Sequence, residues 1–149
     1  MIKWSIFKKI TASDLNSNFN GLADGSEILD GVIEARHFRV GIWYKVGSGN
    51  NPAYQNSWVS YDSGTYYGAY FMKDAQGFVH LRGLVKSGTL NTTIFTLPEG
   101  FRPAYRHIFP AQCNNQIERV DVEPDGEVKT YNDSNVYLSL NGIYFHEEN

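Results

Sequence analysis

The chain has 149 residues, a formal net charge of −3 and scattered basic residues. This size suits one domain with a short appendage, and the charge pattern argues against a nucleic-acid partner. No segment approaches the roughly 20 apolar residues of a membrane span, so membrane insertion is not expected. The lone cysteine, Cys113, excludes an intrachain disulfide and a CxxC metal site.

The opening segment, MIKWSIFKKI, contains Trp4, Ile6, Phe7 and Ile10 but no continuous apolar run of the length found in secretory signals. We therefore expect synthesis and assembly in a cytoplasm. The apolar residues of this segment are expected to attach the chain to another protein.

Residues 10–25 have the spacing of one helical face, formed by Ala12, Leu15, Phe19 and Leu22. A helix of about three turns is marginal on its own in water, so this face needs a partner. It either folds back onto its own domain or assembles with other copies as a neck. Residues 26–41 form a connector, which predicts an N-terminal region over 1–41 and a second domain over 42–149.

From residue 42 onward, apolar residues alternate and turn residues recur every eight to twelve positions. This pattern predicts eight or nine short antiparallel strands and an all-β fold, a β-sandwich or jelly-roll-like barrel. The expected strands include residues 42–46, 57–61, 70–73, 77–88, 94–97, 107–113, 117–122, 136–140 and 143–145.

Three hairpins are predicted with their registers. A four-residue loop at 74–77 would place Met72 opposite Val79 and Phe71 opposite His80. A three-residue loop with Gly126 in the left-handed region would pair 122 with 128 and 120 with 130. The Asn-Gly dipeptide at 141–142 would pair 140 with 143, 138 with 145 and 139 with 144.

The strand in GFVHLRGLVKSG, residues 77–88, has two contrasting faces. Val79, Leu81 and Val85 form a core face. The opposite face combines Phe78 and Leu84 with His80 and Arg82, a mixture that is unusual for a surface in contact with water. This face is predicted to contact another molecule.

Catalytic patterns are lacking. The histidines, His37, His80, His107 and His146, form no HExxH or HxH pattern, so no metal or other cofactor is expected. No GxSxG nucleophile motif is present. The carboxylates at 121, 123, 125 and 127 flank a turn, which favours an exposed hairpin over a glycosidase pair. The sequence therefore predicts a protein that is not an enzyme.

Two segments carry a resemblance to a known family. ITASDLNSNFNGL resembles an N-terminal segment of tail-fibre proteins of tailed bacteriophages. The ordered motifs GFVHLRGLVKSGT, IFTLPEGFRPAYRHIFPA, ERVDVEPDGEV and NVYLSLNGIYF resemble the C-terminal domain of phage tail fibres and baseplate receptor-binding proteins. The resemblance covers roughly residues 10–24 and 56–145.

The resemblance implies a homotrimer at the phage tail tip or baseplate that adsorbs to host cell-wall polysaccharide and docks to other tail proteins through its N-terminus. In such a trimer, the apolar neck and the mixed strand face would contact neighbouring copies. The expected interface residues are Leu15, Phe19, Leu22, Phe71, Phe78, His80 and Arg82.

Saccharide sites combine aromatic platforms with a few polar groups that fix hydroxyls. The loops supply such candidates in Tyr66, Tyr67, Tyr105, Arg106, His107 and Asn114. Trp58 alternates with Val59, which favours the core. Two alternatives stay open: a structural fibre or baseplate component without a ligand, and a hydrolase of surface polysaccharide.

Overall fold

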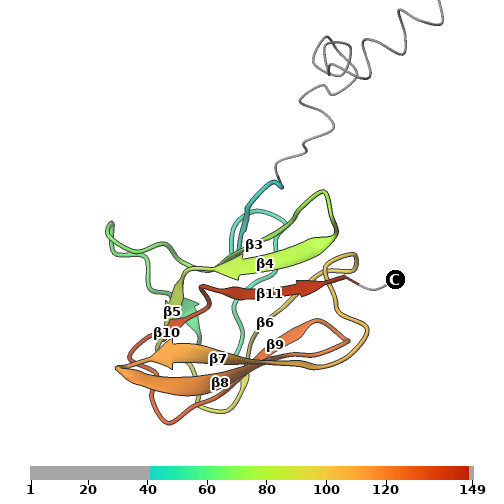
Figure 1. Ribbon diagram of the computed structural model, residues 1–149. Coiled ribbons are helices and arrows are strands. Elements are labelled where there is room, and N and C mark those ends of the chain that lie inside the picture. The colour runs from blue at the N-terminus through green and yellow to red at the C-terminus, as the bar shows by residue number, and fades with distance from the viewer. Residues whose placement is uncertain (1–40, 148–149) are drawn as a thin grey trace, which may run out of the picture. The chain divides into compact units, whose positions relative to one another are not determined.

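The computed structural model describes residues 41–147 (Figure 1). The predicted neck helix at 10–25, with Leu15, Phe19 and Leu22, lies outside the described residues, as does nearly all of the connector. The boundary predicted after residue 41 also stays a prediction. No helix long and apolar enough to cross a membrane occurs among residues 41–147.

The described part of the chain is all-β, with every strand pair antiparallel. A four-stranded sheet has the order β1-β3-β4-β11, and a seven-stranded sheet has the order β2-β5-β10-β7-β8-β9-β6. The prediction of an all-β fold with antiparallel sheets is confirmed. The strands are β1 (Tyr44–Lys45), β2 (Val59–Ser60), β3 (Tyr70–Lys73), β4 (Phe78–Arg82), β5 (Leu84–Lys86), β6 (Thr93–Thr96), β7 (His107–Cys113), β8 (Gln116–Val122), β9 (Glu127–Tyr131), β10 (Leu138–Ser139) and β11 (Ile143–His146).

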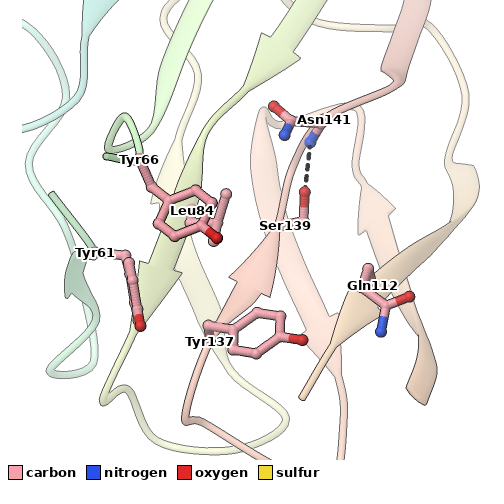
Figure 2. A pocket seen from close by; sticks show the side chains of 7 residues that line it. All are labelled: Tyr61, Tyr66, Leu84, Gln112, Tyr137, Ser139 and Asn141. Carbon is pink, nitrogen blue, oxygen red and sulfur yellow. Dashed lines mark hydrogen bonds between the residues drawn. The ribbon is translucent and has the colours of Figure 1, made fainter. Parts of the chain in front are cut away.

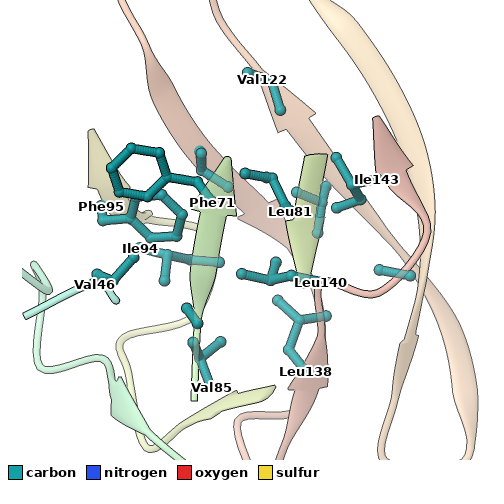
Figure 3. Close-up of a cluster of buried hydrophobic side chains, with 14 of the residues drawn as sticks. Val46, Phe71, Leu81, Val85, Ile94, Phe95, Val122, Leu138, Leu140 and Ile143 are labelled. Atoms are coloured by element: carbon teal, nitrogen blue, oxygen red, sulfur yellow. The ribbon is translucent and has the colours of Figure 1, made fainter. Parts of the chain in front are cut away.

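One hydrophobic core lies between the two sheets, as Figure 3 shows. Alternate residues of each strand point inward, as the period-two pattern requires. A bulge in β6 lets the consecutive residues Ile94 and Phe95 both enter the core. Trp58 is also buried, and its indole N–H donates to Thr92 Oγ1 at 3.2 Å. The expectation that Trp58 is a core residue is confirmed.

The β7–β8–β9 segment is a meander of two tight hairpins. Val122 pairs with Val128 and Val120 with Thr130 across a loop in which Gly126 has a φ of 91°, so this predicted register is confirmed. Three consecutive strands paired in one sheet differ from a jelly roll, in which successive strands alternate between sheets. That finer part of the fold prediction is not supported.

The β3–β4 hairpin exists, but its predicted register is wrong by one residue. Met72 lies opposite His80, and Phe71 lies opposite Leu81. The backbone N–H of Asp74 bonds to the carbonyl of Phe78 at 2.9 Å, and Gly77 has a φ of 88°. The loop therefore contains three residues, which turns every side chain of β3 to the opposite face from the one predicted.

The register correction changes the role of Phe71. Its side chain is only 1% exposed and packs in the core against the rings of Tyr44 and Phe101. The prediction that Phe71 shares a surface with Phe78 and His80 for contact with other copies is therefore wrong.

The last predicted hairpin is also wrong, because its two strands belong to different sheets. β10 pairs with β5 and β7, whereas β11 pairs with β4. Only Gly142 of the Asn-Gly pair has a positive φ, of 84°, as in a type II turn. The hairpin-forming type I′ turn needs a positive φ at both positions.

The neighbouring chain bends at the same place. β4 ends at Arg82 in the four-stranded sheet and β5 starts at Leu84 in the other, with Gly83 between them at a φ of 98°. Asn141 Oδ1 accepts a hydrogen bond from the Gly83 N–H at 2.8 Å, and the Leu140 N–H donates to the Gly83 carbonyl at 2.8 Å. We call this junction, Gly83 with residues 140–142, the corner. It joins the two sheets and fixes the surface beside it.

Candidate functional site

A pocket of about 360 Å³ lies on the outer side of the seven-stranded sheet, next to the corner. Figure 2 shows its side chains, which come from strands β5, β7 and β10, from the loops on either side of β10, and from the loop between β2 and β3. The lining residues are Tyr61, Tyr66, Leu84, Gln112, Tyr137, Ser139 and Asn141.

The floor of the pocket follows from the strand order. Leu84 of β5 pairs with Ser139 of β10, and Leu138 pairs with Cys113 of β7. Gln112 therefore lies on the same face as Ser139, because neighbouring residues of a strand alternate in direction. Three segments far apart in the sequence place their outward side chains in one row.

Aromatic rings form one side of the pocket. The ring of Tyr61 lies edge-to-face with Tyr66 at 5.9 Å and with Tyr137 at 6.3 Å. Such perpendicular pairs are favoured by the ring quadrupoles and hold the rings in defined orientations. Tyr137 is held further by its hydroxyl, which accepts from the Asn115 N–H at 3.1 Å. The aromatic wall is thus fixed before any ligand arrives.

Polar groups form the other side. Ser139 Oγ accepts a hydrogen bond from the Asn141 N–H at 3.2 Å, and Asn141 Oδ1 accepts one from the Gly83 N–H. The side-chain NH₂ of Asn141 is left as a donor, and the exposed Gln112 amide offers both a donor and an acceptor. This combination of rigid rings and uncharged hydrogen-bonding groups suits a ligand with both apolar and hydroxyl-bearing surfaces.

A second surface lies on the outer face of the four-stranded sheet. The registers of β3, β4 and β11 place seven side chains there: Tyr70, Met72, Phe78, His80, Arg82, Tyr144 and His146. Tyr144 is 58% exposed, and Phe78 is 37% exposed. We call these seven residues the outer aromatic face. Its exposed rings are unusual for a surface that meets only water.

Arg82 lies on this face with its guanidinium surrounded by aromatic rings. Its guanidinium lies 3.9 Å from the ring centroid of Trp43, 5.1 Å from Tyr70 and 5.4 Å from Tyr67. Its buried Nε has no hydrogen-bond partner within the part of the chain that the structure describes. Aromatic faces attract the charge, but they do not replace the missing acceptor.

His80, unlike Arg82, has a hydrogen-bond partner within the chain. Its Nε2 lies 2.8 Å from Asp74 Oδ2, and its ring stacks on Tyr144. Asp74 Oδ1 also accepts from the N–H groups of Gln76 and Phe78. Partial burial raises the pKa of Asp74, but the hydrogen bonds with His80, Phe78 and Gln76 outweigh it and leave the pKa below its ordinary value.

Metal chemistry finds no support in this part of the chain. Among residues 41–147, no three His, Cys, Asp or Glu side chains gather closely enough to hold a metal ion. The pocket itself contains neither a histidine nor a carboxylate. The aromatic, amide and hydroxyl side chains that line the pocket are suited to binding an uncharged ligand.

The fold can be compared with solved structures. The receptor binding protein of Listeria phage PSA superposes with a TM-score of 0.61 at 14% sequence identity, over 98% of this chain and 84% of that one. The chain has the fold of this phage receptor binding protein. The resemblance seen in the sequence motifs is thereby confirmed for the fold. No protein-family model matches the sequence, and a comparison with curated proteins finds no match.

The six side chains predicted to bind a saccharide do not lie together in this fold. Only Tyr66 lines the pocket. Tyr67, its neighbour, turns toward Tyr70 and Arg82 beside the outer aromatic face. Asn114 lies in the β7–β8 turn with a φ of 40°. Together with Asn115 it adopts the positive φ that this two-residue turn requires.

The cluster at residues 105–107 lies at the opposite end of β7 from Gln112. Tyr105 is 75% exposed, Arg106 Nε donates to Glu123 at 2.7 Å, and the ring of His107 stacks on Phe109 and Phe145. Gln112 lies five residue steps along the strand from His107, a distance of about 16 Å. These residues cannot share one small ligand with Tyr66.

The sequence-based prediction missed most of the pocket. Tyr61 stands in the same tyrosine-rich stretch as Tyr66 and was a recognisable candidate. Gln112 and Ser139 are outward residues of strands whose adjacency depends on the sheet order. No local motif indicates that β10 lies between β5 and β7.

Proposed function

We propose that this protein is a phage receptor-binding protein that attaches to a saccharide on the host cell surface through the Tyr61–Tyr66–Tyr137 pocket. The observation that carries the proposal is the preformed pocket, aromatic on one side and amide- and hydroxyl-lined on the other. Sugars present the matching combination of C–H faces and hydroxyl groups. The fold shared with a phage receptor binding protein supports the same role.

The proposal includes a homotrimer, with the outer aromatic face as its contact surface. Phe78, His80 and Arg82 were expected there from the sequence, and Tyr144 adds an exposed ring. Exposed aromatic rings and arginine are enriched at protein–protein interfaces. A neighbouring copy would cover the rings and pack against the half-buried Arg82 side chain.

In the virion, the protein would stand at the tail tip or baseplate. We propose that the N-terminal region docks it to other tail proteins, since its apolar residues Trp4, Ile6, Phe7 and Ile10 would suit such a contact. Assembly would take place in the host cytoplasm. Removal of residues 1–9 should therefore prevent incorporation into particles.

The test of receptor binding is adsorption to bacteria. Fluorescently labelled full-length chain is added to a panel of bacterial strains, and bound fluorescence is measured with and without periodate oxidation of the surface glycans. We expect saturable binding to at least one strain and its loss after oxidation. Failure to bind any strain at micromolar concentration would favour a structural component without a ligand.

Two tyrosine variants locate the site. Tyr66→Ala removes part of the aromatic wall and should weaken adsorption at least about fivefold, since losing stacking of roughly 1 kcal/mol or more changes affinity by that order. Tyr105→Ala is the matched control, because Tyr105 is exposed at the far end of β7. Loss of adsorption with Tyr105→Ala alone would place the site at residues 105–107 instead.

A further inference from the structure

We infer that the pocket selects an uncharged pyranose unit and discriminates against acidic sugars and phosphate-bearing groups. The inference rests on the proposed receptor-binding function and specifies the chemical class of its ligand. It follows from the charges, the hydrogen-bonding groups and the size of the pocket.

The first argument is charge. None of the seven lining residues is a lysine, arginine, histidine or carboxylate. Lys86 is not among the lining residues, and its ammonium lies 5.1 Å from the ring centroid of Tyr61. A carboxylate or phosphate entering the pocket would lose water without gaining a bonded counter-charge, which is unfavourable.

None of the four arginines in the described part of the chain lines the pocket. Arg119 makes two hydrogen bonds to the buried carboxylate of Asp121, at 2.6 and 2.7 Å. Arg106 is bonded to Glu123, and Arg102 donates to the Leu97 carbonyl. Arg82 lies on the outer aromatic face, on the other sheet.

The second argument is hydrogen-bonding type. A sugar hydroxyl both donates and accepts, whereas an ionised carboxylate or phosphate oxygen only accepts. Gln112 provides both a donor and an acceptor, Asn141 provides its NH₂, and Ser139 provides a hydroxyl. In Figure 2 these three side chains lie across the pocket from Tyr61, Tyr66 and Leu84. A pyranose with one C–H face on the rings would turn its hydroxyls toward them.

The third argument is size. The cavity of about 360 Å³ is near the lower end of small-molecule sites, which span roughly 300–1,000 Å³. It has room for one or two sugar rings. A chain end or a side branch of a surface polysaccharide therefore fits better than a long internal segment.

The experiment compares uncharged glycosides with the matching uronides and with a phosphate-bearing compound. The ¹⁵N-labelled full chain is titrated with methyl β-D-glucopyranoside, methyl β-D-galactopyranoside and methyl N-acetyl-β-D-glucosaminide. The glucuronide and galacturonide partners, and glycerol phosphate, are titrated in parallel. The side-chain NH₂ signals of Gln112 and Asn141 report binding in the pocket itself.

We expect saturable shifts of these two signals with at least one uncharged glycoside. For the galactoside and glucoside, binding should be at least about tenfold tighter than for the matching uronide, as expected when a charge loses water without a partner. Equal or tighter binding of the uronides or of glycerol phosphate would overturn the inference. So would the absence of shifts with every uncharged glycoside.

A charge-changing variant gives an independent check. Gln112→Lys adds a cation at an exposed position and should reduce or reverse the preference for the uncharged sugar, whereas Gln112→Glu should increase it. Equal preferences in both variants and the original chain would contradict the inference.

Adsorption to cells separates this inference from the proposed function. Tyr66-dependent adsorption combined with a preference for uronides would preserve receptor binding and overturn the uncharged ligand. Absence of adsorption to any strain would overturn the proposed function itself.

Discussion

Asp74 stabilises the β3–β4 loop with both of its carboxylate oxygens. One oxygen accepts from two backbone N–H groups of the loop, and the other bonds to His80 on the outer aromatic face. His80, a polar residue among the apolar side chains of its strand face, thus finds its hydrogen-bond partner within the chain. Arg82, two residues further along β4, is surrounded by rings instead.

The lowered pKa of Asp74 predicts a pH dependence of stability. Its carboxylate favours the folded state above the unfolded pKa of about 3.9, and this contribution is lost as the pH falls through the folded pKa, which lies lower. Urea unfolding of the original chain and of Asp74→Asn, at pH 5 and at pH 2.5, measures this contribution. We expect the unfolding free energy to fall more on acidification in the original chain than in the variant.

The asparagine variant separates charge from geometry, because its side-chain oxygen can still accept from the loop N–H groups. Asp74→Ala also removes those acceptors and should cost a further ~1 kcal/mol at neutral pH. Asp133→Asn, at an exposed position, serves as the control. An unchanged acid dependence in Asp74→Asn would show that this carboxylate does not contribute.

At the scale of elements, single backbone conformations decide which strands pair. A positive φ at Gly77 shortens the β3–β4 loop to three residues and brings Phe71 into the core. Positive φ at both Asn114 and Asn115 closes the tight β7–β8 hairpin. Positive φ at Gly142 alone instead sends β10 and β11 into different sheets.

The corner predicts a strong effect of one added methyl group. A Cβ at Gly83 would overlap the backbone carbonyl of Gly68, and the φ of 98° is unfavourable for alanine. Gly83→Ala should lower the unfolding free energy by about 2–3 kcal/mol or more, because backbone on both sides must shift. Chemical denaturation followed by tryptophan fluorescence measures the loss.

Gly142→Ala is the matched control within the same corner. Gly142 also has a positive φ, of 84°, but a Cβ there meets nothing within 4 Å. This variant should lose only about 1 kcal/mol from backbone strain. Equal losses in the two variants would show that the close approach of Gly68 does not govern the corner.

At the scale of the whole molecule, the two outer surfaces differ in kind. The seven-stranded sheet carries the pocket, and the four-stranded sheet carries the outer aromatic face. With contact between copies assigned to one sheet and ligand binding to the other, assembly would leave the pocket open. A trimer would then present three equivalent pockets to a cell surface, which raises avidity without tighter individual sites.

The assembly prediction concerns molecular mass in solution. Light scattering of the full chain at micromolar concentration should give three times the 16.9 kDa of one copy. Tyr144→Ala and Arg82→Glu should reduce this mass, since both change the outer aromatic face. Ile108→Ala, at an exposed position of the other sheet, should not. A monomeric original chain would contradict the trimer, and circular dichroism confirms that each variant is folded.

The sequence by itself determined the all-β class, most strand positions and the β8–β9 register, and it indicated Tyr66 as a candidate ligand-binding residue. These depend on local alternation and turn residues, which act between near neighbours in the chain. Only the tertiary structure decided the burial of Phe71, the separation of β10 from β11 and the meeting of Leu84, Ser139 and Gln112. Those features depend on which distant strands pair, and the free energy of that choice comes from packing the whole core.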